Sequence, residues 1–66
     1  MNADAAAEKA REFLNRMGFH FVQVTKTRQE SNSWVVQADV GYTRPRVATI
    51  VIDSQTGSVE SHEVED

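Results

Sequence analysis

The 66-residue chain contains no cysteine, one proline and three glycines. Without cysteine, neither a disulfide framework nor a thiolate metal site can stabilise the fold. No apolar run approaches the ~20 residues that a membrane-spanning helix needs. The chain also lacks an excess of positive charge, since ten acidic residues and seven basic ones give a formal net charge of -3. This balance disfavours nucleic acid and anionic membranes as partners.

The first residues, Met1 to Asp4, are not basic, and no apolar segment of signal-peptide length follows them. We therefore expect a cytoplasmic protein, unless an export signal has been removed ahead of Met1. The length permits one domain, residues 1–66, because a chain of this size buries only ~60% of the surface that it exposes when unfolded. With 39% hydrophobic and 26% charged residues, the chain has the composition of a folded domain.

One amphipathic helix is predicted from Ala3 to Met17. Its apolar side chains recur with helical spacing and form a single stripe, at Ala6, Ala10, Phe13, Leu14 and Met17. Asn2 or Asp4 can cap its N-terminus, and Gly18 can supply the left-handed residue that ends it.

Three or four β-strands are predicted after the helix. β-branched and aromatic residues, or charged residues suited to an edge, define the runs 19–28, 34–42, 47–53 and 58–64. Polar turns of hairpin length separate these runs, at 29–33, 43–46 and 53–57. The order predicts an α+β fold, with one N-terminal helix packed on one face of a three- to four-stranded antiparallel β-meander.

The alternation of side chains predicts which residues the helix covers. In the second strand the apolar set Trp34, Val36, Ala38, Val40 and Tyr42 should face the helix. In the first strand Val22 and Val24 should do so, with His20 and Lys26 on the same side.

One helix leaves the other face of the sheet uncovered. Val35, Val47 and Val51, together with Phe19 and Phe21, should lie there. An apolar patch on so small a domain indicates a protein partner or a second copy of the chain. Scattered exposed valines are the alternative interpretation.

Trp34 and the run 53–59, Asp-Ser-Gln-Thr-Gly-Ser-Val, resemble the PepSY-type small domain. In that family an N-terminal helix precedes a strand that begins near a tryptophan and a strand that ends in an Asp-x-x-Thr-Gly-x-Val turn. The resemblance implies a role in restraining peptidases or in sensing at the cell envelope. Over residues 3–62 the order of elements also resembles the gas-vesicle O proteins, which are cytoplasmic accessories of gas-vesicle assembly. An ordinary tight turn would favour the same Asp, Thr and Gly.

Side chains suited to catalysis are sparse. A nucleophile needs an activating base, and the chain has only two histidines, His20 and His62. His62 with Glu60 or Glu63 could bind zinc or nickel, but histidines without metal-ligand spacing are more often surface residues. We therefore predict no enzymatic activity, no cofactor and no metal site.

The run Arg44-Pro45-Arg46 is the one basic cluster beside an aromatic residue, Tyr42. With Lys26 and Arg28 nearby, such a loop could bind nucleic acid or another anion. Two arginines that keep a hairpin tip soluble are the alternative.

The sequence thus predicts a non-catalytic interaction or regulatory module. It should bind a protein partner or itself through the open sheet face or an edge strand. The residues expected to contact the partner are Val35, Val47, Val51, Arg44 and Arg46. Binding of nucleic acid or an anion through the arginine loop is the second hypothesis.

Overall fold

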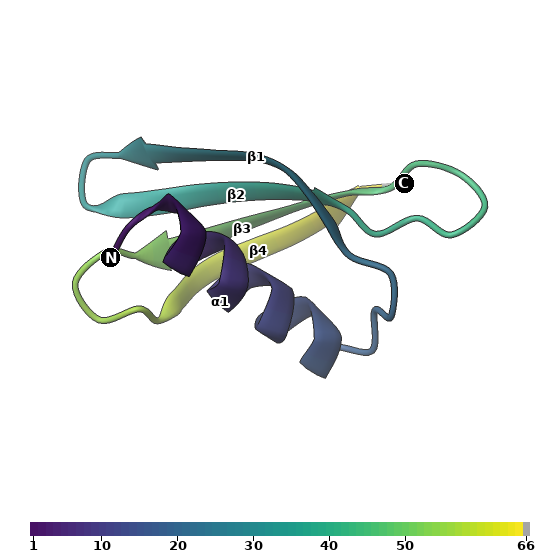
Figure 1. Ribbon diagram of the computed structural model, residues 1–66, viewed down its shortest axis with the longest axis horizontal. Coiled ribbons are helices and arrows are strands. Elements are labelled where there is room, and N and C mark those ends of the chain that lie inside the picture. Colours follow the sequence, from purple (N-terminus) through teal and green to yellow (C-terminus); the bar gives the residue numbers. More distant parts are fainter. Residues whose placement is uncertain (66) are drawn as a thin grey trace.

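The computed structural model describes residues 1–65 and shows one helix packed on a four-stranded sheet (Figure 1). The elements are α1 (Ala3–Arg16), β1 (Gln23–Glu30), β2 (Ser33–Asp39), β3 (Val47–Asp53) and β4 (Val59–Glu65). The strands lie in the order β1-β2-β3-β4, and each neighbouring pair is antiparallel. The predicted α+β fold, with its N-terminal helix on one face of a meander, is confirmed, and the meander has four strands.

Both ends of α1 are set by local hydrogen bonds. The Ala5 N–H donates to Asn2 Oδ1 at 2.8 Å, so Asn2 is the N-cap. At the other end Gly18 has φ of 104°, and the Phe19 N–H donates to the carbonyl of Leu14 at 3.1 Å. This left-handed stop ends the helix where the sequence predicts.

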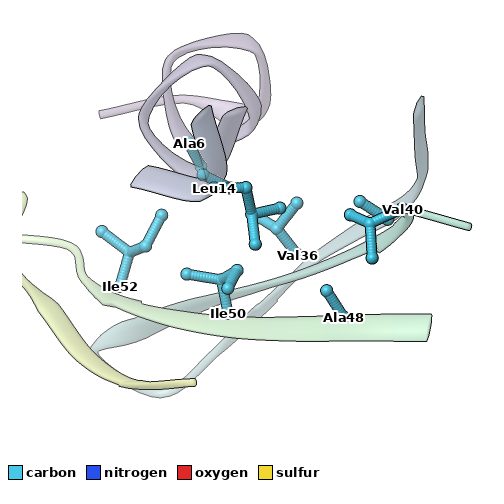
Figure 2. Close-up of a cluster of buried hydrophobic side chains, with 9 residues drawn as sticks. Ala6, Leu14, Val36, Val40, Ala48, Ile50 and Ile52 are labelled. Atoms are coloured by element: carbon cyan, nitrogen blue, oxygen red, sulfur yellow. The ribbon is translucent and has the colours of Figure 1, made fainter. Parts of the chain in front are cut away.

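The hydrophobic core lies between α1 and the two central strands (Figure 2). Its buried side chains are Ala6, Ala10, Leu14, Val36, Ala38, Val40, Ala48, Ile50 and Ile52. Those contributed by β2 and β3 are all even-numbered, as the two-residue period of a strand requires. Among residues 1–65 no polar side chain is buried, so apolar burial is the main source of stability.

Of the two aromatic residues predicted to face the helix from the second strand, Trp34 does so and Tyr42 does not. Trp34 is only half-buried and packs at the margin of the core. Tyr42 is 92% exposed, because β2 ends at Asp39 and the chain leaves the sheet before reaching it. The pattern of alternation was correct, but it extended beyond the strand.

β1 begins at Gln23, four residues after the predicted start. Its first partner is Asp39, the last residue of β2, so residues 19–22 have no strand to pair with. Phe19 continues the helix cap and packs on the core, whereas Phe21 is 44% exposed ahead of the sheet. The expectation that Phe19 and Phe21 lie on the uncovered face of a strand is therefore wrong.

A β-bulge at Thr25 reverses the predicted orientation of Lys26. Val24 pairs with Ala38 but Lys26 pairs with Gln37, so Thr25 is an extra residue in β1. Its hydroxyl donates to the carbonyl of Gln37 at 3.2 Å. Lys26 consequently lies on the face opposite Val24, away from the helix, and its predicted place beside the helix is wrong.

The turn between β1 and β2 is tighter than its polar composition predicts, whereas the loop between β2 and β3 is longer than predicted. Between β1 and β2 only Ser31 and Asn32 lie outside the strands, and Ser31 has φ of 51°. The turn after β3 agrees with the prediction: Asp53 Oδ1 accepts the Gln55 N–H at 2.8 Å and Gly57 has φ of 76°. Glu65 pairs with Val47 at the end of β4, and Asp66 lies outside the described residues.

Candidate interaction surface

The sheet face opposite α1 has no second layer among residues 1–65 (Figure 1). We call this surface the open face. Strand register and side-chain alternation place on it Gln23, Lys26, Arg28, Glu30, Ser33, Val35, Gln37, Asp39, Val47, Thr49, Val51, Asp53, Ser61, Glu63 and Glu65. All these residues are half-buried or exposed, in contrast to the buried set on the helix side.

Valines occupy the centre of the open face. Val35 on β2 and Val51 on β3 are direct cross-strand partners. Gln37 and Thr49 form the adjacent cross-strand pair. Val47, which is 43% exposed, lies beyond Thr49 on β3 and pairs with Asp39. The structure thus places the three valines that the sequence selected on one face, with Val35 and Val51 as a pair at its centre and Val47 apart from them, between Asp39 and Glu65.

The cations of the open face lie on one outer strand, whereas acidic side chains lie on all four strands, with Glu30 beside Arg28 on β1, Asp39 on β2 and Asp53 on β3. Lys26 and Arg28 are on β1, and Glu63 and Glu65 are on β4. Three strand spacings of ~4.8 Å separate the outer strands by about 14 Å, which exceeds the Debye length of ~8 Å at physiological salt. The basic and acidic margins therefore cannot neutralise each other within one molecule.

Two polar contacts lie near one end of the same face. Arg28 Nε is 2.6 Å from Glu30 Oε2, within β1. The hydroxyl of Ser33 donates to Glu60 Oε1, which draws the Glu60 side chain across β3 towards β2. Lys26 forms no ion pair with any residue from 1 to 65 in this geometry, so its charge is available to a partner.

Both edge strands are interrupted. β1 has its bulge at Thr25, and a register shift leaves Glu60 unpaired in β4, whereas β2 and β3 pair without interruption. Bulges and charged side chains at sheet edges oppose the addition of another strand. Of the two surfaces that the sequence offered for binding, the geometry favours the open face over the edges.

The arginine loop between β2 and β3 is organised by Asp39. Asp39 Oδ1 accepts N–H bonds from Gly41 at 2.9 Å and from Arg46 at 3.3 Å. The guanidinium carbon of Arg46 lies 5.8 Å from the centre of the Phe19 ring, within cation–π range. Because Phe19 packs on the core, this contact places Arg46 on the helix side of the sheet.

The five residues predicted to contact a partner therefore do not form one surface. The three valines lie on the open face, Arg44 is exposed in the loop and Arg46 contacts Phe19. Lys26 and Arg28 lie on the face opposite Arg46. The basic residues that the sequence grouped are thus separated by the sheet.

Gly41 is required for the close fold of this loop. A Cβ on Gly41 would lie 1.7 Å from the carbonyl oxygen of Arg44. We expect Gly41→Ala to lower the free energy of unfolding by about 2 to 3 kcal/mol, because backbone must move to admit the methyl group.

Gly18→Ala is the matched control for Gly41→Ala. A Cβ there meets no atom within 4 Å, and only its φ of 104° is unfavourable. Its expected cost is about 1 kcal/mol. Urea unfolding of both variants measures the difference, and equal stabilities would contradict the assigned packing of the loop.

Sequence reasoning missed a hollow of about 320 Å³ on the helix side. It lies between α1 and the start of β4, and is lined by Lys9, Glu12, Phe13, Arg16, Gly57, Ser58 and Val59. Only the position of the helix over the β3–β4 turn creates it, so no local pattern signals it. Its lining includes neither histidine nor cysteine, and it offers no nucleophile paired with an imidazole base.

The histidines do not assemble a metal site in the part of the chain that the structure describes. His62 pairs with Ile50 on the helix side of β4, and its ring centre is 5.1 Å from that of Phe13. Glu60 and Glu63 point to the opposite side of that strand. No group of three or more potential ligand residues lies together within residues 1–65.

The fold and this surface define the chain as a small α+β domain whose sheet is covered on one face and open on the other. Comparisons with protein-family models, with curated proteins and with solved structures find no match. The resemblance to PepSY domains and gas-vesicle O proteins stays a hypothesis that these comparisons do not test. No helix of residues 1–65 has the length and apolar character to cross a membrane.

Proposed function

We propose that this domain is a non-catalytic interaction module that binds protein through its open face. The observation that carries the proposal is the central pair of valines, Val35 and Val51, on a sheet face with no covering layer in the described chain. The helix side already contains a complete core, so these valines are not needed to build it. Uncovered apolar side chains rimmed by charged ones are typical of protein contact surfaces.

The dimensions of the open face also suit this role. Four strands of seven residues span roughly 19 Å by 23 Å, from the usual strand spacing and rise. Two such faces in contact would bury roughly 900 Å² in total if each is treated as a flat surface. This area is near the lower limit of specific interfaces. The face can therefore support a weak or transient contact by itself.

Two alternatives have less support. Strand addition at the edges is opposed by the bulges at Thr25 and Glu60. In the Arg44-Pro45-Arg46 loop few basic side chains could contact nucleic acid together, because Lys26 and Arg28 lie on the other side of the sheet from Arg46. Neither alternative is favoured by a specific contact.

A photo-cross-linker placed on the open face tests the proposal. Because the chain has no cysteine, Val51→Cys provides a single thiol for a benzophenone maleimide. We expect irradiation in an extract of cells that make the protein to give one main protein adduct, identified by mass spectrometry. Excess unlabelled protein should prevent the adduct, whereas unlabelled Val35→Lys should compete poorly.

The control is Asn15→Cys, at an exposed position of α1 on the covered side of the sheet. It should give none of the same adduct. Absence of any adduct at Val51→Cys, or equal labelling from both positions, would contradict a binding role for the open face.

A further inference from the structure

We propose that the occupant of the open face is a second copy of this chain, docked face to face so that β1 of each protomer lies over β4 of the other. The inference rests on the proposed function of the open face and adds the identity and orientation of the partner. It comes from the position of Lys26 on β1 and of Glu63 at the same level on β4.

A symmetric pair of sheets with aligned strands can form in two ways. If the two-fold axis runs parallel to the strands, β1 lies over the partner's β4 and β2 over the partner's β3. If the axis runs across the strands, each strand lies over its own copy. In either case the same surface is used by both subunits, as in most homodimers.

The charges favour the first arrangement. With the axis parallel to the strands, Lys26 faces Glu63 of the partner subunit, while Arg28, already paired with Glu30 in its own strand, faces Ser61 of the partner subunit. With the axis across the strands, the basic margin would face itself, and so would the acidic margin. Like charges brought together at an interface cost several kcal/mol, so the second arrangement is disfavoured.

The strand register makes the first arrangement specific. Lys26, Gln37, Thr49 and Glu63 lie at one level across the sheet. Rotation about an axis parallel to the strands keeps this level, so Lys26 faces Glu63 of the partner subunit at each of two symmetric positions.

The adjacent level across the sheet is apolar at its centre. It runs through Arg28, Val35, Val51 and Ser61. The same rotation places Val35 over Val51 of the partner subunit, and Val51 over Val35 of the partner subunit. Apolar contacts thus meet in the middle of this level and Lys26 meets Glu63 at both margins of the neighbouring level, whereas Asp39 faces Val47 of the partner subunit at the level beyond.

The modest area sets the expected strength of the dimer. With roughly 900 Å² buried in total, we expect a dissociation constant in the micromolar range or weaker. Because the ion pairs lie at the solvated margins, salt should weaken the association.

Charge reversal tests both the partner and the orientation. Lys26→Glu alone should raise the dissociation constant of the homodimer at least about tenfold, because Glu63 of the partner subunit then faces a like charge twice. Glu63→Lys alone should do the same. An equimolar mixture of the two variants should form a heterodimer with affinity within about threefold of the unchanged protein, since both facing pairs become opposite in charge again. Sedimentation equilibrium measures all three.

The restoration can only be intermolecular, because Lys26 and Glu63 are about 14 Å apart in one chain. Arg11→Glu, at an exposed position of α1, is the control and should leave the dissociation constant unchanged. Circular dichroism melting should show that every variant folds, since the reversed positions are exposed.

The outcomes separate this inference from the proposed function. A protein that stays monomeric, or a mixture that fails to restore association, overturns the docked pair. If the cross-linker at Val51→Cys then yields a heterologous adduct, the open face still binds protein. An adduct of twice the chain mass, together with restored association in the mixture of the two charge-reversed variants, supports both the docked pair and the proposed function of the open face.

Discussion

Ile50→Lys should prevent the domain from folding, whereas Val51→Lys should leave it folded. Ile50 is 0% exposed at the centre of the core beneath α1 (Figure 2). An unpaired ammonium there costs more than the ~5 kcal/mol of stability typical of small domains. Val51 is the next residue of β3 but lies on the open face, where a lysine can extend into water.

Circular dichroism and the dispersion of amide signals, recorded at low protein concentration, distinguish the two variants. Their side chains differ only in the face of the sheet that they occupy, so each is the control for the other. Two folded variants, or a folded Ile50→Lys beside an unfolded Val51→Lys, would show that the helix does not cover the even-numbered face.

Leu14→Ala should lower the free energy of unfolding by about 3 to 5 kcal/mol. Leu14 is 0% exposed and is the largest fully buried side chain that α1 contributes. Its loss removes transfer free energy and leaves a cavity that Ala6 and Ala10, with their short side chains, cannot fill. The chain has no cysteine, so no disulfide can compensate for the loss. Because the expected loss approaches the whole stability of a small domain, the variant should be close to unfolded at about 37 °C.

Phe13→Ala is the control for Leu14→Ala. Phe13 is only half-buried and lies against His62 at the margin, so its truncation should cost less than that of Leu14. Denaturant unfolding gives both values. A cost below about 1 kcal/mol for Leu14→Ala would contradict the packing of α1 on the sheet.

The elements that the sequence predicted well are those with strong local signals. The stripe of Ala6, Ala10 and Leu14 and the stop at Gly18 defined the helix, because capping and periodicity act over a few residues. β3 was predicted to the residue, since a run that is apolar on both sides between turn residues suits a central strand.

The elements that it predicted poorly depend on contacts distant in sequence. Only pairing with Gln37 reveals that Thr25 is an extra residue, and this one bulge moves Lys26 to the other face. β2 ends because Asp39 binds the loop as far as Arg46, which composition does not signal. Alternation alone therefore predicted a strand that continues to Tyr42, three residues beyond its end.

The candidate surface was predicted in part for the same reasons. Val35, Val47 and Val51 followed from alternation within two strands. The opposed charges of β1 and β4 did not, because they need the register of all four strands and the bulges at both edges. Arg46 was assigned to a basic surface, but its contact with Phe19 depends on the three-dimensional path of the loop.

Dilution from about 1 mM to about 10 μM spans the affinity expected of the homodimer, and the methyl signals recorded over this range test most directly whether two copies associate through the open face. The signals of Val35 and Val51 should shift with concentration, while those of Val36 and Ile52 in the core should stay nearly constant. Constant Val35 and Val51 signals, or shifts confined to the helix side, would contradict the docking of two copies through the open face.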